Sequence, residues 1–389
     1  MLFDGIERGY TGPIRHAEPN FVYLNRSARP QAVAIRATLE EWFSRYPEGE
    51  TKNDLQGRFR SGDDAQYRSS FFELLLHELC RQLSCIAEPH PDVEGTTKKP
   101  DFLVRPSHGS PFYLEAAIVT DESDQEAAAR ARINAIYDSL ERLVSPDFFV
   151  GIQINGLPVS QPPARQIRAF LAKKLASVDP DEITRLYNAK GYDALPRWSF
   201  HDQEWSIEFY PIPKRREARG EPGVRPIGAI TTSFRETHTD LAIKRTLEEK
   251  AGYYGELDLP YVIAVDALTE FGIYTDDVMN ALFGTEHVLI PRDSSAGSGV
   301  KYQRALDGLW TSPKGPRYTR VSCVLIAVVD AWNLPNATVC LYHNPWARYP
   351  YDSPLTNLPQ AKAEDNNMKW LDGKRLGELL HLPAAWPTD

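Results

Sequence analysis

The sequence predicts an α/β fold in which helices flank a mixed central sheet. The first observation is a set of short apolar segments with strand character, bounded by turn residues. These segments lie at residues 100–104, 112–119, 148–154 and 261–266. The second observation is that helical periodicity fills the intervals between them, as is typical of a sheet covered on both faces. The pattern leaves open whether 148–154 or 261–266 is the neighbour of 112–119.

The composition is that of an ordinary globular chain, long enough for a large core or two domains. The 389 residues are 42% hydrophobic and 25% charged. No apolar run approaches the roughly 20 residues that a membrane helix needs. The N-terminal stretch lacks the basic-then-apolar order of a signal peptide, and the 4 cysteines form no CxxC pair. We therefore expect a cytoplasmic protein with no membrane partner and no zinc site.

The formal net charge of −9 argues against a protein that coats DNA through bulk positive charge. It leaves room for an enzyme that binds phosphates through a local basic patch. The candidate patches are Lys98-Lys99, Lys214-Arg215-Arg216 with Arg219, and Arg317 with Arg320. Each of them can equally consist of solvated loop charges.

Residues 1–65 are expected to form an irregular N-terminal arm followed by one helix. That helix is predicted at residues 31–46, where apolar residues recur at helical spacing and Pro47-Glu48-Gly49 ends the pattern. The polar stretch 49–68 is predicted to be a loop.

The next amphipathic helix, predicted at residues 70–83, carries the first candidate site residue, Glu73. Ser70 and Glu73 have the spacing of a capping box, in which the glutamate bonds back to the start of its own helix. Alternatively, Glu73 faces a site on the same side of the helix as His77, four residues later.

Two carboxylates are expected to meet at the edge of the predicted sheet. Pro100 begins the strand 100–104, where its missing N–H is tolerated, and Asp101 follows it. Glu115 lies in the strand 112–119, which a hairpin-like connection joins to the first. Buried carboxylates are costly unless their charge is compensated, and a divalent cation is a common solution. The alternative is that Asp101 caps a turn and Glu115 is a surface charge.

The predicted domain organisation is a core with additions. The core is expected over residues 66–290, with an insertion around 156–235 that contains a Trp- and Pro-rich stretch. A C-terminal extension over 291–389, packed on the core, adds strands at 321–329 and 338–342.

The helix with Glu73, the Pro100-Asp101 strand start and the strand with Glu115 together resemble the PD-(D/E)xK nuclease superfamily, also called restriction endonuclease-like. The resemblance covers about a quarter of the chain and implies a restriction endonuclease-like core. It implies that Asp101 and Glu115 bind a metal ion, that Glu73 supports it, and that all three are catalytic. The whole chain is also similar to a group of uncharacterised bacterial proteins with the same order of FFELLLHEL, HP, PDFLV and LEA segments.

The chain departs from the superfamily motif at one position. The motif has a lysine two residues after the glutamate, where this chain has Ala117. A lysine from another element can take that place, with Lys244 and Lys250, or Lys98 and Lys99, as candidates. Alternatively, a metal ion alone activates the water, or the site is inactive.

Two classes of function follow. The resemblance implies a metal-dependent endonuclease that hydrolyses phosphodiester bonds in bacterial restriction, repair or defence. Carboxylate oxygens suit Mg²⁺ or Mn²⁺, and such an ion lowers the pKa of a bound water. The alternative is a catalytically silent subunit of the same fold that binds nucleic acid or acts as a scaffold. For both classes of function, the expected partners are nucleic acid, with DNA favoured over RNA, and proteins of a defence system.

Overall fold

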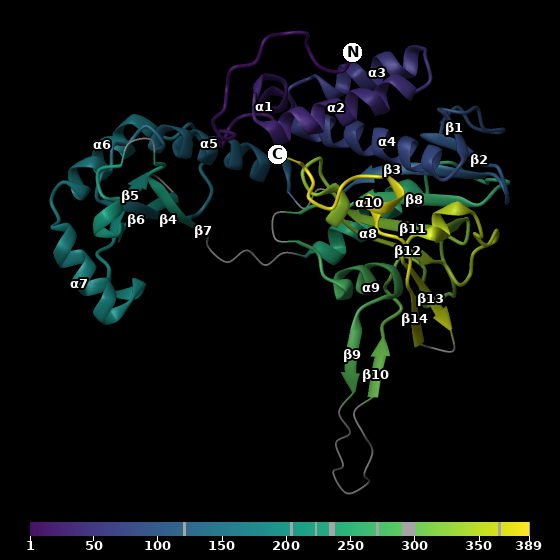
Figure 1. Ribbon diagram of the computed structural model, residues 1–389. Coiled ribbons are helices and arrows are strands. Elements are labelled where there is room, and N and C mark those ends of the chain that lie inside the picture. Colours follow the sequence, from purple (N-terminus) through teal and green to yellow (C-terminus); the bar gives the residue numbers. More distant parts are fainter. Residues whose placement is uncertain are drawn as a thin grey trace, which may run out of the picture. The chain divides into compact units, whose positions relative to one another are not determined.

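The chain folds into two compact units (Figure 1). The structure is a computed structural model that describes residues 1–119, 122–202, 205–221, 224–232, 238–269, 272–289, 301–364 and 367–388. Unit 1 comprises Met1–Gly12, Pro19–Asp121 and His238–Asp389, and unit 2 comprises Pro13–Glu18 and Glu122–Thr237.

Unit 1 is built on an 8-stranded sheet with the order β1-β2-β3-β8-β11-β12-β13-β14. The strands are β1 (Cys85–Pro89), β2 (Phe102–Pro106), β3 (Phe112–Ile118), β8 (Tyr261–Asp266), β11 (Val321–Val328), β12 (Thr338–His343), β13 (Gln360–Glu364) and β14 (Asn367–Leu371). The neighbours β3, β8 and β11 run parallel, as do β12 and β13, and the other pairs are antiparallel. The predicted class, a mixed central sheet with flanking helices, is confirmed.

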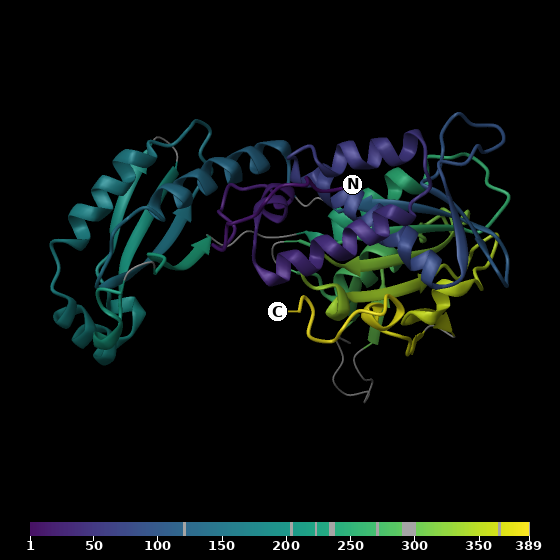
Figure 2. The ribbon, with the colours of Figure 1, turned by 45° about the horizontal axis from the view of Figure 1, so that its top comes forward.

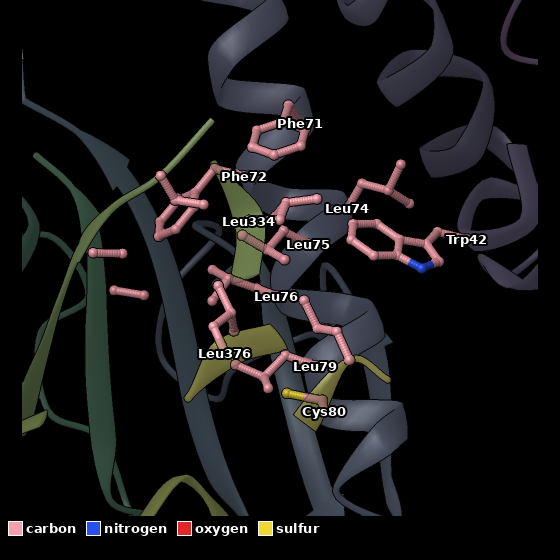
Figure 3. Packing of buried hydrophobic residues seen from close by; sticks show 14 of the residues in the cluster. Trp42, Phe71, Phe72, Leu74, Leu75, Leu76, Leu79, Cys80, Leu334 and Leu376 are labelled. Atoms are coloured by element: carbon pink, nitrogen blue, oxygen red, sulfur yellow. The ribbon is translucent and has the colours of Figure 1, made fainter. Parts of the chain in front are cut away.

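Helices cover both faces of this sheet (Figure 2). On one face lie α1 (Asn20–Arg26), α2 (Pro30–Arg45), α3 (Glu50–Phe59), α4 (Asp64–Gln82) and α10 (Leu376–Leu379), and on the other lie α8 (Thr239–Ala251) and α9 (Thr275–Phe283). Because side chains alternate along a strand, Leu114 of β3 packs toward α4 while Tyr113 and Ala117 pack toward α8. Figure 3 shows the α4 face of the core, where Leu74 of α4 lies beside Trp42 of α2.

The remaining elements of unit 1 are short. They are the two-stranded hairpin of β9 (Glu286–Leu289) and β10 (Lys301–Arg304), and the 3₁₀ turns η4 (Leu334–Asn336) and η5 (Pro354–Asn357). In the described part of the chain, no helix is long and apolar enough to cross a bilayer.

Unit 2 has its own sheet and its own apolar core. The sheet has the order β5-β6-β4-β7, formed by β4 (Phe148–Asn155), β5 (Trp198–Asp202), β6 (Trp205–Pro213) and β7 (Ile227–Thr232). Its helices are α5 (Asp124–Leu140), α6 (Ala164–Leu175) and α7 (Pro180–Lys190), with the turns η1 (Tyr192–Ala194) and η2 (Arg216–Ala218). Ile136, Ile152, Ile167 and Ile207 are fully buried together and join the helices to the sheet.

Two expectations about the N-terminal region are wrong. The stretch 49–68 was predicted to be a loop, yet it contains α3, whose buried Leu55 and Phe59 are too few to give a clear helical pattern. The helix that carries Glu73 begins at Asp64, because the side chain of Asp63 caps it. Ser70 therefore lies inside the helix and donates to Gln66 O, so the capping-box explanation of Glu73 does not hold.

The structure also places one predicted strand and the unit boundaries differently. The strand at 148–154 was expected in the central sheet, but as β4 it pairs with β6 and β7 in unit 2, so β8 is the neighbour of β3. The inserted unit begins at Glu122 rather than near 156, because α5 packs with β4 and α6. The predicted boundary at 291 lies outside the described residues. Of the strands described after it, β11 to β14 belong to the central sheet, and β10 pairs with β9.

Candidate active site at the pairing of β2 and β3

Asp101 and Glu115 lie side by side where β2 pairs with β3. The antiparallel register sets Phe102 opposite Leu114, so Asp101, one residue before β2, comes opposite Glu115. The backbone N–H of Asp101 donates to Glu115 Oε2 over 3.3 Å. Asp101 Oδ2 in turn accepts the backbone N–H of Ala116 over 2.7 Å. The structure thus brings together the two carboxylates that the sequence singled out.

The surroundings of this pair concentrate negative charge. Glu115 is 2% exposed, and the side chain of Asp101 keeps 23% of its surface in contact with solvent. Burial, followed by the charges of Glu115 and Glu73, raises the pKa of Asp101 well above its ordinary value, although the Ala116 N–H opposes this. The neighbouring donors therefore do not fully compensate the charge of Asp101.

A lysine from a distant part of the chain contacts Glu115. Lys250, near the end of α8, donates from Nζ to Glu115 Oε1 over 2.5 Å, and the hydroxyl of Tyr254 donates to Glu115 Oε2 over 2.5 Å. Burial alone would lower the pKa of Lys250, but the charge of Glu115 and its hydrogen bond outweigh burial and raise it. The parallel pairing of β3 with β8 causes this contact, because it brings α8 over the face on which Glu115 lies.

The other candidate lysines lie elsewhere. Lys244 donates to Asp307 O over 2.6 Å, and Lys99 pairs with Asp92 over 2.8 Å. Lys98 lies 3.5 Å from the centre of the Tyr253 ring. Lys250 is therefore the candidate that the fold brings to the carboxylate pair.

Glu73 lies near this pair but holds partners of its own. Its Oε1 accepts the hydroxyl of Tyr46 over 2.8 Å, and its Oε2 accepts Nη2 of Arg58 over 2.6 Å. Its charge contributes to the raised pKa of Asp101. Within the described residues, Glu73 forms no hydrogen bond with Asp101 or Glu115.

Two histidines lie close to these acidic residues. The Nε2 of His90 is 3.9 Å from Asp101 Oδ1, and its backbone N–H donates to Asp101 O over 2.9 Å. His77 contacts the rings of Tyr46 and Phe102, and burial lowers its pKa to about 4. Because His77 is buried among aromatic rings and its lowered pKa makes it a weak base, we assign it to packing.

The sequence did not single out Tyr254, Tyr46 or Arg58. Tyr254 follows Lys250 by four residues, a spacing that could have marked the two as one group on α8 and its end. Tyr46 and Arg58 carry no such signal, because their contact with Glu73 depends on how α2, α3 and α4 pack.

Asp101 and Glu115 are the two side chains of this group that could hold a magnesium or manganese ion, because both offer carboxylate oxygens. No group of three or more His, Cys, Asp and Glu side chains that could hold a metal ion occurs in the described ranges. Magnesium, however, is commonly bound through one or two carboxylates together with waters and substrate phosphates. The charges of Glu115 and Glu73 act on the buried Asp101, and a cation bound there would offset them.

Comparisons with models of protein families, with curated proteins and with solved structures found no match to this chain. Any functional assignment therefore depends on the geometry and chemistry of the site itself.

Proposed function

We propose that this protein is a metal-dependent nuclease that hydrolyses phosphodiester bonds, with a core of the restriction endonuclease-like type. The observation that carries the proposal is the group formed by Asp101, Glu115 and Lys250. Two adjacent carboxylates meet at a strand pairing, and a lysine lies within hydrogen-bond distance of one of them. The partner we propose is nucleic acid, DNA before RNA, acting in the cytoplasm within a bacterial defence, restriction or repair system.

In this proposal each residue of the group has a separate task. Asp101 and Glu115 would hold the ion, and Glu73 would keep the local field negative enough to favour a divalent cation. When bound, magnesium supplies charge neutralisation and a water of lowered pKa. Lys250 would take the place that Ala117 leaves without a charged group, since both residues lie on the α8 side of β3. Its ammonium group would hold the attacking water and favour negative charge on the phosphate.

A specific observation favours the silent subunit as the second candidate. Both carboxylate oxygens of Glu115 already accept a donor, from Lys250 and Tyr254. Glu73 is likewise bonded through both oxygens. Buried charges satisfied in this way need no ion, and a protein of this kind would bind nucleic acid without cutting it.

The test is cleavage of labelled DNA and RNA by the purified full chain with Mg²⁺ or Mn²⁺. We expect Asp101→Asn and Glu115→Gln each to lower the rate by at least about 100-fold, since either change removes a metal ligand. Glu364→Gln, which neutralises an exposed carboxylate at the end of β13, is the matched control and should cut at the wild-type rate.

A calorimetric titration that measures Mn²⁺ binding separates the two candidate functions. The nuclease should bind the ion, and Asp101→Asn should not. A wild type that binds nucleic acid but neither binds Mn²⁺ nor cuts would identify the silent subunit instead.

A further inference from the structure

A second site lies at the start of the parallel strands β8 and β11. A cavity of about 400 Å³ opens there, of a size common for small-ligand sites. It is lined by Gly255, Glu256, Leu257, Arg317, Tyr318, Thr319, Arg320 and Arg348. The lining comes from the α8–β8 connection, the segment before β11 and the turn after β12. The backbone N–H of Arg348 donates to Thr319 O over 2.7 Å, which joins the turn after β12 to the segment before β11.

The lining is strongly cationic, with three arginines against one glutamate. Arg348 is 3.3 Å from Glu256, whose side chain is 86% exposed. Arg317 is 3.4 Å from Glu248. These separations exceed the usual 2.7–2.9 Å of a charge-assisted hydrogen bond, so both carboxylates are loosely held partners.

The guanidinium groups are nevertheless held in place. Arg317 donates to the hydroxyl of Tyr318 over 3.0 Å, and Arg320 donates to the backbone carbonyl of Gly255. Arg348 lies 5.4 Å from the centre of the Tyr349 ring. Each guanidinium carries five N–H donors, so most of them are available to an anion that enters the cavity.

The cavity adjoins the carboxylate site through one short connection. Tyr254, which donates to Glu115, is followed directly by Gly255, Glu256 and Leu257 of the cavity wall. The backbone N–H of Tyr261, the first residue of β8, is anchored by the hydroxyl of Ser322 in β11 over 3.0 Å. A polyanion that reaches Asp101 and Glu115 would therefore extend a neighbouring phosphate toward the arginines.

We propose that Arg317, Arg320 and Arg348 form a subsite for a backbone phosphate of the nucleic acid, next to the bond that is cut. The proposal rests on the proposed function in naming a nucleic acid as the source of the phosphate. Arginine suits this task because its planar fork of donors matches two phosphate oxygens at once. The overall negative charge of the chain makes such a local cationic cavity necessary for binding a polyanion.

The test measures the affinity of the full chain for a fluorescent DNA oligonucleotide in EDTA, where no cleavage occurs. Arg317→Gln, Arg320→Gln and Arg348→Gln should each weaken binding by about tenfold at moderate salt. Each should also reduce the slope of log Kd against log salt by about 0.9, the amount for one lost phosphate contact. The control, Lys369→Gln, removes an exposed cation that pairs with exposed Glu364, as Arg348 pairs with Glu256, and should change neither quantity.

The outcomes separate this proposal from the proposed function. Weaker binding by the arginine variants in a protein that never cuts would support the subsite and overturn the nuclease. Unchanged binding by arginine variants of a protein that does cut would overturn the subsite alone. Binding of inorganic phosphate with no effect of the arginines on DNA would assign the cavity to a free phosphate and overturn the proposal. Arg320→Lys, which keeps the charge and loses the fork, provides a folded variant of intermediate affinity if a glutamine variant is unstable.

Discussion

The surroundings of Glu73 and of Glu115 are built alike. Each glutamate is almost fully buried, and each accepts one tyrosine hydroxyl and one cationic side chain. The two lie on different elements, Glu73 on helix α4 and Glu115 on strand β3. A buried glutamate with a tyrosine and a cation is therefore not by itself the mark of a reactive site.

The difference lies in what adjoins each glutamate. Arg58, beside Glu73, is always charged, and its Nε also donates to Asp54 over 2.8 Å, so both oxygens of Glu73 are bonded within a network that holds its own permanent cation. Glu115 adjoins a second carboxylate, Asp101, and its cation is a lysine, whose compact ammonium group contacts one oxygen of Glu115. The Glu73 group therefore has the properties of a structural ion pair, and the Glu115 group has those of a site that can accept a cation.

The largest effect should come from Lys250. We expect Lys250→Met to lower the rate of phosphodiester cleavage by about 100-fold, because a preorganised charge near the reacting phosphate contributes about that much. Lys244→Met is the matched control on the same helix, since Lys244 donates to Asp307 O, and should cut at the wild-type rate. Cleavage rates under single-turnover conditions provide the comparison. Equal rates for Lys250→Met and Lys244→Met would show that Lys250 only neutralises Glu115.

The next effect concerns stability on the Glu73 side. Arg58→Met should lower the free energy of unfolding by about 2–3 kcal/mol, because it leaves a buried carboxylate without its cation. The double variant Arg58→Met/Glu73→Gln should recover part of that loss, since the glutamine carries no charge. Urea denaturation measures both. Magnesium should not raise the melting temperature of Arg58→Met but should raise that of Lys250→Met. The opposite result would place the cation site at Glu73 and the structural ion pair at Glu115.

The smallest effect is a gain in stability. The folded-state pKa of Asp101 is raised, so the stability this group contributes is present below its unfolded pKa and is lost as the pH rises through its folded pKa. At pH 7, Asp101→Asn should therefore be more stable than the wild type, because the amide has nearly the same shape and carries no charge to bury. The advantage should shrink as the pH is lowered toward 4. Thermal melts of both proteins between those pH values test this, and an advantage that grows toward acid would contradict it.

The local part of the site could be predicted from the sequence because it depends on short-range geometry. Asp101, just before β2, and Glu115 in β3 are 14 residues apart, and the two-residue period of a strand determines which side chains meet. The helix with Glu73 could be predicted from its apolar spacing, although its start at Asp64 could not, since the true cap lies in a polar stretch.

The long-range part could not be predicted. Lys250 was one of four candidate lysines, and only the pairing of β3 with β8 distinguishes it. The apolar strands β4 and β8 have similar composition, so no local property indicates which of them joins the central sheet. Arg58 was missed because α3 buries few apolar residues, so its sequence resembles that of a polar loop.

The insertion of unit 2 has a consequence for biosynthesis. Glu115 and Lys250 are 135 residues apart, and most of the intervening chain is unit 2. At a translation rate of about 5–20 residues per second, β3 leaves the ribosome on the order of ten seconds before α8 and β8. During that interval unit 2 can form its own core, while the edge of β3 has no partner and Glu115 has no lysine. A nascent chain therefore carries the acidic half of the site well before the basic half, and premature termination leaves the carboxylates without the cation that completes them.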